Sequence, residues 1–337
     1  MRRFIVLGWV WIAVSGFSLG VAWGAKPAQK PAEQQPAAPA PGVSPLQGAF
    51  KQASRDGRPV LALGAWPACP LCKSFLGRLG KDASLQPLLP NYVFVVLNVD
   101  APTEHQELAK LRNMEGLLPF MYVVRADGQV LSVTANASAE PTVAALLRDG
   151  IAKSGKFLRP ADVPKYEAAY AKAQAALERE DTPQALTVLG GMGIGKGESF
   201  ATVLVDSQKM FEHIKSQAKH DIGEIEQSMQ GKDRLTAAVQ LVDATHKYSK
   251  LPEESKALGA LLKEFKSDSE DKPFVSQAEE IVKARDHVRA KRKDRAMQSY
   301  ELVIRKYPDS PAATLAKAEL AVLQETAPAD GAKKRAK

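Results

Sequence analysis

Strand-like and helix-like sequence patterns divide this chain of 337 residues into two unlike parts. Between about residues 45 and 157, short apolar runs alternate with stretches whose apolar residues recur at helical spacing. Between about residues 158 and 324, no strand pattern occurs, and alanine, leucine, lysine and glutamate recur with helical periodicity. We therefore expect an α/β domain over residues 46–157, followed by an all-α domain over residues 158–327.

The α/β part is predicted to contain a mixed sheet. Strands are expected at residues 60–65, 92–99, 120–124 and 130–133, the first two of them buried. Helices are expected at residues 46–56, 70–85, 104–114 and 141–151. The 70–85 stretch has apolar residues at helical spacing: Leu71, Phe75, Leu76 and Leu79. A helix between the first two strands requires a parallel pair, and the Asp127-Gly128 turn between the last two favours an antiparallel hairpin.

Residues 1–24 have the pattern of a secretory signal peptide. Two arginines precede an uncharged run from Phe4 to Trp23, and the small residues Ala22 and Gly24 suit cleavage before Ala25. The pattern predicts export to the periplasm or another extracytoplasmic location, where disulfides persist. The alternative is an uncleaved anchor helix that would retain the protein at the membrane.

Two other segments lack the large apolar side chains that a folded core needs. Residues 25–45 are rich in proline and alanine, and we expect them to form an extended linker. Residues 328–337 form a basic tail that we expect to be disordered. The folded domains are therefore expected between these two segments.

The helical part resembles tetratricopeptide-type repeats. Its helical pattern is broken at Glu180-Asp-Thr-Pro183, and a predicted pair of helices over residues 278–323 is broken at Lys306-Tyr-Pro-Asp-Ser-Pro311. The Tyr-Pro-Asp-Ser-Pro stop is similar to the turn of tetratricopeptide helical hairpins, although no regular repeat period is visible. We predict an irregular helical-repeat domain, and the resemblance implies that it binds a protein partner in a concave groove.

Cys69 and Cys72 are the only cysteines of the chain. The Cys-Pro-Leu-Cys sequence follows a predicted strand and opens a predicted helix, where free N–H groups and the helix dipole lower the pKa of a thiol. Pro70 suits the first helical turn, which needs no N–H group. This context predicts a redox pair in which Cys69 is the nucleophile and Cys72 is the resolving thiol.

Other interpretations of the cysteine pair are open at this point. A structural disulfide across so short a loop would constrain the unfolded chain very little. A metal site would need ligands beyond two thiolates, and the five histidines are scattered along the chain, so we expect no bound metal. A folded but catalytically slow, vestigial site is the main competitor, because a fold does not fix a function.

The sequence around the pair is similar to that of the thioredoxin-like family, above all its exported members. The similarity covers about residues 46–155 and is carried by Gly57–Trp66, Cys69-Pro-Leu-Cys72, the strand at 93–100 and Leu118-Pro119 before the hairpin. The resemblance implies a cis Leu118–Pro119 bond, with Pro119 facing the cysteines. It also implies that the Leu118 backbone binds an extended substrate and that Trp66 packs over the site.

The chain departs from this family near the first cysteine. Pro67 and Ala68 separate Trp66 from Cys69, whereas the family usually has tryptophan directly before the cysteine. Many reductases of the family carry a buried acid that moves the proton of the resolving thiol, and Leu63 stands at that position here. The missing acid argues against a fast general reductase but leaves thiol chemistry open.

Two further patterns mimic ligand-binding motifs. Gly190–Gly197 matches a phosphate-binding loop except that Gly197 replaces the magnesium-binding Ser or Thr, and it follows a helical pattern. We expect a flexible connector there and no nucleotide. Lys283–Arg295 contains seven basic and two acidic residues, and in an exported protein we expect a solvated helix face and no nucleic acid.

Together these features predict an exported thiol–disulfide oxidoreductase that acts on protein thiols and disulfides. The Cys69–Cys72 disulfide would serve as the redox group without a separate cofactor, and Lys73 would either favour the thiolate or be solvated. The helical domain would bind a protein partner. The alternative is an envelope scaffold in which the helical domain acts and the thioredoxin-like domain is a passive module.

Overall fold

The computed structural model describes residues 43–111, 118–135, 140–195 and 197–325. The elements in chain order are α1 (Pro45–Asp56), β1 (Val60–Ala65), α2 (Pro70–Leu79), the 3-10 helix η1 (Leu89–Asn91), β2 (Val93–Asn98), α3 (Pro102–Leu111), β3 (Phe120–Val124), β4 (Val130–Thr134), α4 (Glu140–Lys153), α5 (Val163–Leu177), α6 (Thr182–Gly191), α7 (Thr202–Met229), α8 (Arg234–Lys247), α9 (Pro252–Ser267), α10 (Lys272–Arg289), α11 (Lys293–Lys306) and α12 (Pro311–Glu325).

The strands and helices divide as the sequence patterns predict. All four strands lie before α4, and the elements from α5 to α12 are helices. The predicted signal peptide, almost all of the proline-rich linker and the basic tail lie outside the described residues. The described chain therefore consists of an α/β part and a helical part.

The strands of the described α/β part form one mixed sheet in the order β2-β1-β3-β4. β1 is parallel to β2 and antiparallel to β3, with Gly64 opposite Phe120. β3 and β4 form an antiparallel hairpin, in which Gly128 adopts a φ of +93° in the turn. The predicted mixed sheet and hairpin are confirmed.

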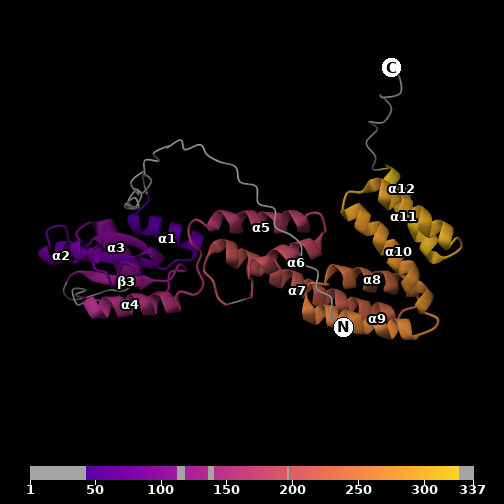
Figure 1. Ribbon diagram of the computed structural model, residues 1–337, viewed down its shortest axis with the longest axis horizontal. Coiled ribbons are helices and arrows are strands. Elements are labelled where there is room, and N and C mark those ends of the chain that lie inside the picture. Colours follow the sequence, from indigo (N-terminus) through magenta and orange to yellow (C-terminus); the bar gives the residue numbers. More distant parts are fainter. Residues whose placement is uncertain (1–42, 112–117, 136–139, 196, 326–337) are drawn as a thin grey trace, which may run out of the picture. The chain divides into compact units, whose positions relative to one another are not determined.

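β1 is a fully buried inner strand, and its alternating side chains face two apolar layers. Leu61 and Leu63 pack in a cluster with residues of α2 and α4, whereas Val60 and Ala62 pack with residues of α1 and α3. Figure 1 shows α4 on one side of the sheet and α1 and α3 on the other. Helices thus cover both faces of the sheet.

Two predicted elements of the α/β part differ from the structure. β2 was expected to be buried, but it is an edge strand and exposes Val96. The helix after the cysteines ends at Leu79 instead of residue 85, because the chain turns where the Asp82 carboxylate accepts the N–H of Ser84. An apolar run cannot distinguish a central from an edge strand, since both can be largely apolar.

The helices α5–α12 pack around one apolar core. The breaks predicted at residues 180–183 and 306–311 fall between α5 and α6 and between α11 and α12. The segment at 278–323 was expected to form two helices but contains parts of three, because the chain turns at Lys291, which has a φ of +55°. No Gly or Pro marks this turn, so the sequence pattern missed it.

The basic stretch Lys283–Arg295 is not the uniformly solvated face that its composition predicted. The Arg285 guanidinium donates to Glu319 at 2.6 Å, and the Arg289 guanidinium donates to Asp243 at 2.7 Å. Both arginine side chains are mostly buried in these ion pairs. They therefore belong to the packing between helices.

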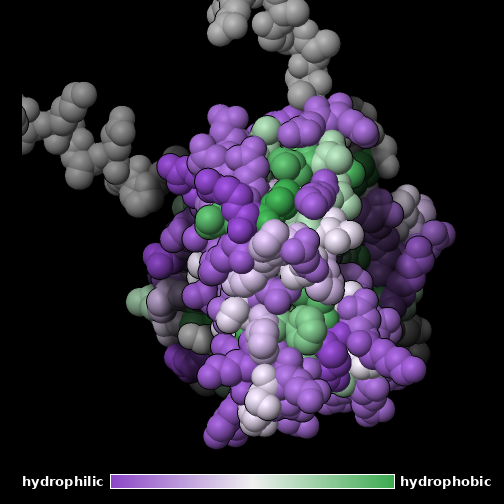
Figure 2. Space-filling view, turned by 90° about the vertical axis from the view of Figure 1, so that its right-hand side faces the viewer, coloured by the Kyte–Doolittle hydropathy of each residue, from purple (hydrophilic) through white to green (hydrophobic). Residues whose placement is uncertain are grey.

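Figure 2 views the structure from the side of its last helices and shows a largely hydrophilic face, on which hydrophobic side chains gather in two patches. Large hydrophobic side chains are exposed on α10, α11 and α12, namely Val288, Leu302 and Val322. Within the residues described, no helix is both long enough and apolar enough to span a membrane.

The helical part joins the α/β part near the amino end of β1. The contacts come from the end of α1 and from the β3–β4 hairpin: Leu158 N–H to Asp56 O (2.7 Å), Thr202 Oγ1 to Ser54 O (2.8 Å), Arg55 to Glu167 (3.0 and 3.1 Å), and the Arg125 guanidinium over the Phe200 ring (3.9 Å). Backbone hydrogen bonds, an ion pair and a ring contact thus combine in this junction.

We predict that Gly57→Ala destabilises the protein more than Gly128→Ala. Both glycines have positive φ, +81° and +93°, which costs an alanine about 1 kcal/mol. A Cβ at Gly57 would also lie 2.8 Å from the Ala201 nitrogen, whereas Gly128 faces open space. Urea unfolding should show a loss of about 1 kcal/mol for Gly128→Ala and a clearly larger loss for Gly57→Ala. Equal losses would contradict the tight junction at Gly57.

Candidate functional site

The cysteine pair lies at the carboxyl end of β1, where the chain turns into α2. The N–H of Cys69 donates to the carbonyl oxygen of Trp66 at 3.0 Å and closes a turn over Pro67 and Ala68. These are the two residues that the thioredoxin-like pattern lacks. These two extra residues change only the turn itself, because Cys69 still lies directly before the first residue of α2.

Cys69 is the N-cap residue of α2. Its backbone is extended, with φ −74° and ψ 115°, and its Sγ accepts the N–H of Cys72 at 3.2 Å. Pro70 follows as the first helical residue, where its missing N–H costs no hydrogen bond. A sulfur that caps a helix amino terminus meets free N–H donors and the positive end of the helix dipole, which both favour the thiolate.

The two thiols have opposite pKa shifts. The hydrogen bond from the Cys72 thiol is the largest cause that lowers the pKa of Cys69, and the backbone N–H groups of Cys72 and Leu71 add to it. Burial is the largest cause that raises the pKa of Cys72. Cys69 is 8% exposed and Cys72 only 1% exposed. Both side chains are buried, Cys72 more deeply, so the pair combines a thiol of lowered pKa at the helix terminus with a more deeply buried thiol of raised pKa.

Apolar side chains with exposed surface flank Cys69. Trp66 is 41% exposed and Leu71 is 54% exposed. The helical spacing grouped Leu71 with Phe75 and Leu79, which are buried, so this grouping was wrong for Leu71. Leu71 lies in the first turn of α2, next to the sulfur that caps the helix. Its position between the two cysteines was the signal that could have assigned it to the site.

The segment before β3 lies beside the same end of β1. Since Gly64 is opposite Phe120, the preceding residue Pro119 lies next to the turn that leads to Cys69. The Leu118–Pro119 bond is cis, as the resemblance implied, and Leu118 packs against the buried cluster that contains both cysteines. The structure thus packs Leu118 against the cysteine cluster and places Pro119 beside the turn that precedes Cys69.

Lys73 and Leu63 complete the surroundings of the pair. Lys73 is exposed on α2, which agrees with the solvated alternative for its side chain. Leu63 is fully buried in the same cluster as Cys72. An apolar side chain therefore stands where many reductases of the thioredoxin-like family carry an acid, and burial is the largest cause that raises the pKa of Cys72.

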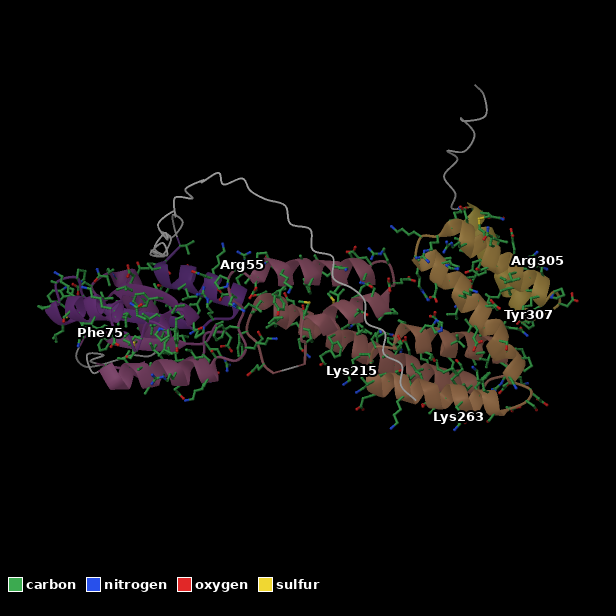
Figure 3. All side chains as sticks on the ribbon, in the orientation of Figure 1. Arg55, Phe75, Lys215, Lys263, Arg305 and Tyr307 are labelled. Carbon is green, nitrogen blue, oxygen red and sulfur yellow. The ribbon has the colours of Figure 1, made fainter. Side chains whose placement is uncertain are left out.

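The site and the junction lie at opposite ends of the α/β part. Figure 3 labels Phe75, which packs in the cysteine cluster, at the far end from Arg55, which pairs with Glu167 at the junction. β1 runs from the junction to the site, and six residues of strand span about 20 Å. The helical part therefore attaches well away from Cys69.

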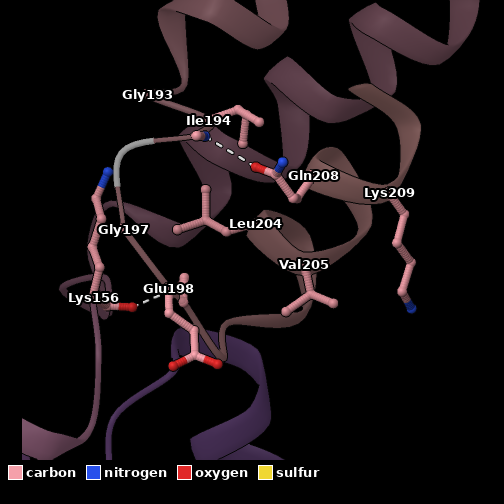
Figure 4. A pocket seen from close by; sticks show the side chains of 11 residues that line it. Lys156, Gly193, Ile194, Gly197, Glu198, Leu204, Val205, Gln208 and Lys209 are labelled. Atoms are coloured by element: carbon pink, nitrogen blue, oxygen red, sulfur yellow. Dashed lines mark hydrogen bonds between the residues drawn. The ribbon is translucent and has the colours of Figure 1, made fainter. Parts of the chain in front are cut away.

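The glycine-rich stretch connects α6 to α7, as predicted, and lines a cavity of about 380 Å³ (Figure 4). Gly193, Gly195 and Gly197 have positive φ, and the N–H of Gly195 donates to Gln208 Oε1 at 3.0 Å. Lys196 lies outside the described residues. Because a helix precedes the loop, it lacks the strand–loop–helix context in which such loops bind phosphate.

We compared the described residues with the patterns of metal sites and the chain with known proteins, and neither comparison suggests another function for the cysteine pair. Across the described ranges, no group of three or more His, Cys, Asp or Glu side chains is placed to hold a metal ion. No model of a known protein family matches the chain, and no curated protein matches it at a significant level. Interpretation of the cysteine pair therefore rests on its own geometry and chemistry.

We predict that Cys69 reacts with iodoacetamide with an apparent pKa below the ordinary thiol value of about 8.5. Cys72→Ala removes the thiol that donates to Cys69, so the apparent pKa should rise in this variant. Lys73→Ala should leave it unchanged, because the lowering arises from hydrogen bonds at the helix terminus. The pH dependence of the alkylation rate, followed by mass spectrometry, measures both effects. A rise in Lys73→Ala with none in Cys72→Ala would contradict this cause.

Proposed function

We propose that the protein is a thiol–disulfide oxidoreductase whose redox group is the Cys69–Cys72 pair. The observation that carries the proposal is the asymmetry of the two thiols at the start of α2. Cys69 caps the helix and has a lowered pKa, whereas Cys72 is more deeply buried and has a raised pKa. A redox pair needs one attacking thiolate and one protected resolving thiol, and this asymmetry supplies both.

The reaction follows from these roles. The Cys69 thiolate attacks one sulfur of a substrate disulfide, the substrate S–S bond breaks, and one substrate thiolate leaves. Cys72 then loses its proton to the departing thiolate or to water and attacks Cys69 Sγ. The Cys69–Cys72 disulfide forms, the second substrate thiol is released, and two electrons pass from the protein to the substrate. The same steps in reverse oxidise a substrate dithiol.

The rim of the site fits a protein substrate. The exposed side chains of Trp66 and Leu71 can pack against apolar residues beside a substrate disulfide. The backbone of Leu118, next to the pair, would bind an extended substrate segment. The packing of Trp66 over the site stays a prediction.

We also propose a thioredoxin-like fold for the α/β part. Four features support it: the mixed sheet with β1 as an inner strand, the cysteine pair at the start of α2, the cis proline before β3, and helices on both faces. The resemblance in sequence covers the same elements. The assignment would place this chain among exported members of that family, since residues 1–24 have a signal-peptide pattern.

The helical part is proposed to bind a protein partner, as tetratricopeptide-type repeats do. The helical part attaches near the amino end of β1, and Cys69 follows the carboxyl end. A partner bound to the helical part would therefore not cover the cysteine site, which supports a role separate from catalysis. The competing function is a scaffold with a passive α/β module. The buried Leu63 in place of an acid favours that alternative, because it removes a proton acceptor for Cys72.

We predict that Cys72→Ser forms mixed disulfides with protein substrates and that Cys69→Ser does not. Without the resolving thiol, the first intermediate persists, so incubation with a disulfide-containing protein should yield adducts that dithiothreitol releases. The adducts are measured by non-reducing electrophoresis and mass spectrometry. The double variant Cys69→Ser/Cys72→Ser is the matched control for non-specific association.

Two outcomes would contradict the proposed function. If Cys72→Ser forms no adduct with any disulfide substrate, the α/β part is a passive module and the scaffold alternative holds. If Cys69→Ser forms adducts as readily as Cys72→Ser, the roles of the two thiols are wrong.

A further inference from the structure

Three cavities of the helical part meet around two residues. Their volumes are about 480, 310 and 410 Å³, and Glu180 and Arg289 line all three. The other charged residues that line them are Asp181, Asp243, Lys247, Arg285, Asp286 and Glu319. We call this continuous surface the Glu180 groove. It is formed by the turn between α5 and α6 together with α7, α8, α10, α11 and α12.

Glu180 has an unfavourable backbone conformation at the centre of this groove. Its φ is +59°, in the left-handed region that favours glycine, and its side chain is exposed. Its N–H closes the end of α5 by donating to the carbonyl of Leu177 at 2.9 Å. A glycine would make the same turn at about 1 kcal/mol lower cost. A glutamate here therefore gives no advantage to the turn itself, which points to a use for its carboxylate.

The cationic side chains of the groove are already neutralised. Arg289 is held by Asp243 and Asp286 at 2.7 and 2.9 Å. Arg285 is held by Glu319 at 2.6 Å, and that carboxylate also accepts the hydroxyl of Tyr300 at 2.6 Å. Lys247 is held by Asp221 at 3.0 Å. These pairs fix the shape of the groove wall and leave little positive charge for a ligand.

Carboxylates are in excess along the groove. Five carboxylates and three Lys or Arg groups line the three cavities, so the excess is two negative charges with the histidines neutral. Among the described residues, no ion pair involves Glu180. The chain as a whole has a net charge of +8. The groove is thus an acidic strip on a basic protein, and it attracts cationic groups.

Aliphatic surface lies beside these charges. Leu177 lines the groove next to Glu180, and Val288, which is exposed, lines it next to Arg289. Lysine and arginine side chains bury their methylene stems on such surface while the charged end meets a carboxylate. The combination of aliphatic wall and central carboxylate therefore fits an extended cationic segment.

We propose that the Glu180 groove binds an extended segment of a partner protein that carries lysine or arginine side chains, with one cation placed against Glu180. The inference rests on the part of the proposed function in which the helical part binds a protein, and it names the chemistry of that partner. It does not require the cysteine pair.

The test uses the full chain and two fluorescein-labelled peptides of alanine and leucine, one with lysines and the other with glutamates at the same positions. Fluorescence anisotropy should show binding of the lysine peptide, weakening at high ionic strength, and no binding of the glutamate peptide. Glu180→Lys should weaken binding by about tenfold or more. The matched control is Glu226→Lys, an exposed glutamate of α7 outside the groove, which should bind like the wild type.

A second variant shows whether a loss of peptide binding comes from the missing carboxylate or from a destabilised fold. Glu180→Gly removes the carboxylate but suits the positive φ, so it should bind the lysine peptide as weakly as Glu180→Lys and be at least as stable as the wild type. Unchanged binding in both Glu180 variants, equal binding of the two peptides, or no binding at all would overturn the proposal.

Failure of this proposal can be distinguished from failure of the redox function. Cys69→Ser should bind the lysine peptide as tightly as the wild type, because the groove contains no cysteine. Loss of peptide binding in Cys69→Ser would assign the signal to the cysteine site and overturn the groove. Disulfide trapping without peptide binding would refute the groove alone, and peptide binding without trapping would refute the redox function alone.

Discussion

Burial of β1 on both faces is the constraint on which the positions of the other elements depend. Its alternating side chains join two apolar layers, so a shift of the strand would expose both at about 25 cal/mol per Å². The strand ends at the turn that makes Cys69 the cap of α2. At its other end it adjoins Gly57, which packs against Ala201 of the helical part. One rigid strand therefore fixes both the reactive sulfur and the junction.

The asymmetry of the two cysteines arises from position alone. Cys69 meets the N–H groups of a helix terminus, and Cys72 lies one turn further in, among apolar side chains that include Leu63. The hydrogen bond from the Cys72 thiol, together with the N–H groups of the helix terminus, lowers the pKa of Cys69, and burial raises the pKa of Cys72. The Glu180 groove differs from the cysteine site in that charged side chains dominate it. Carboxylates neutralise its cations and leave a local negative charge. The two sites are therefore suited to different ligands.

Local sequence signals predicted most of the fold. The Asp127-Gly128 turn, the strand at 60–65 and the helix that ends at Gly57 follow from residue chemistry within a few positions, and they are confirmed. The edge position of β2 and the exposure of Leu71 depend on which surfaces meet in three dimensions, so apolar spacing alone could not predict them. The turn at Lys291 was missed because no Gly or Pro marks it, and the partial burial of Arg285 was missed because its partner Glu319 lies on a different helix, α12.

The central claim is that Cys69 and Cys72 form a reversible redox pair. Its most direct test is equilibration of the full chain in glutathione buffers of graded potential, followed by acid quenching, thiol labelling and mass spectrometry. The account predicts that both cysteines change state together in one two-electron transition, with a midpoint between about −270 and −120 mV, the range of disulfide oxidoreductases. Thiols that remain reduced across all buffers, or a disulfide that none of them reduces, would contradict it.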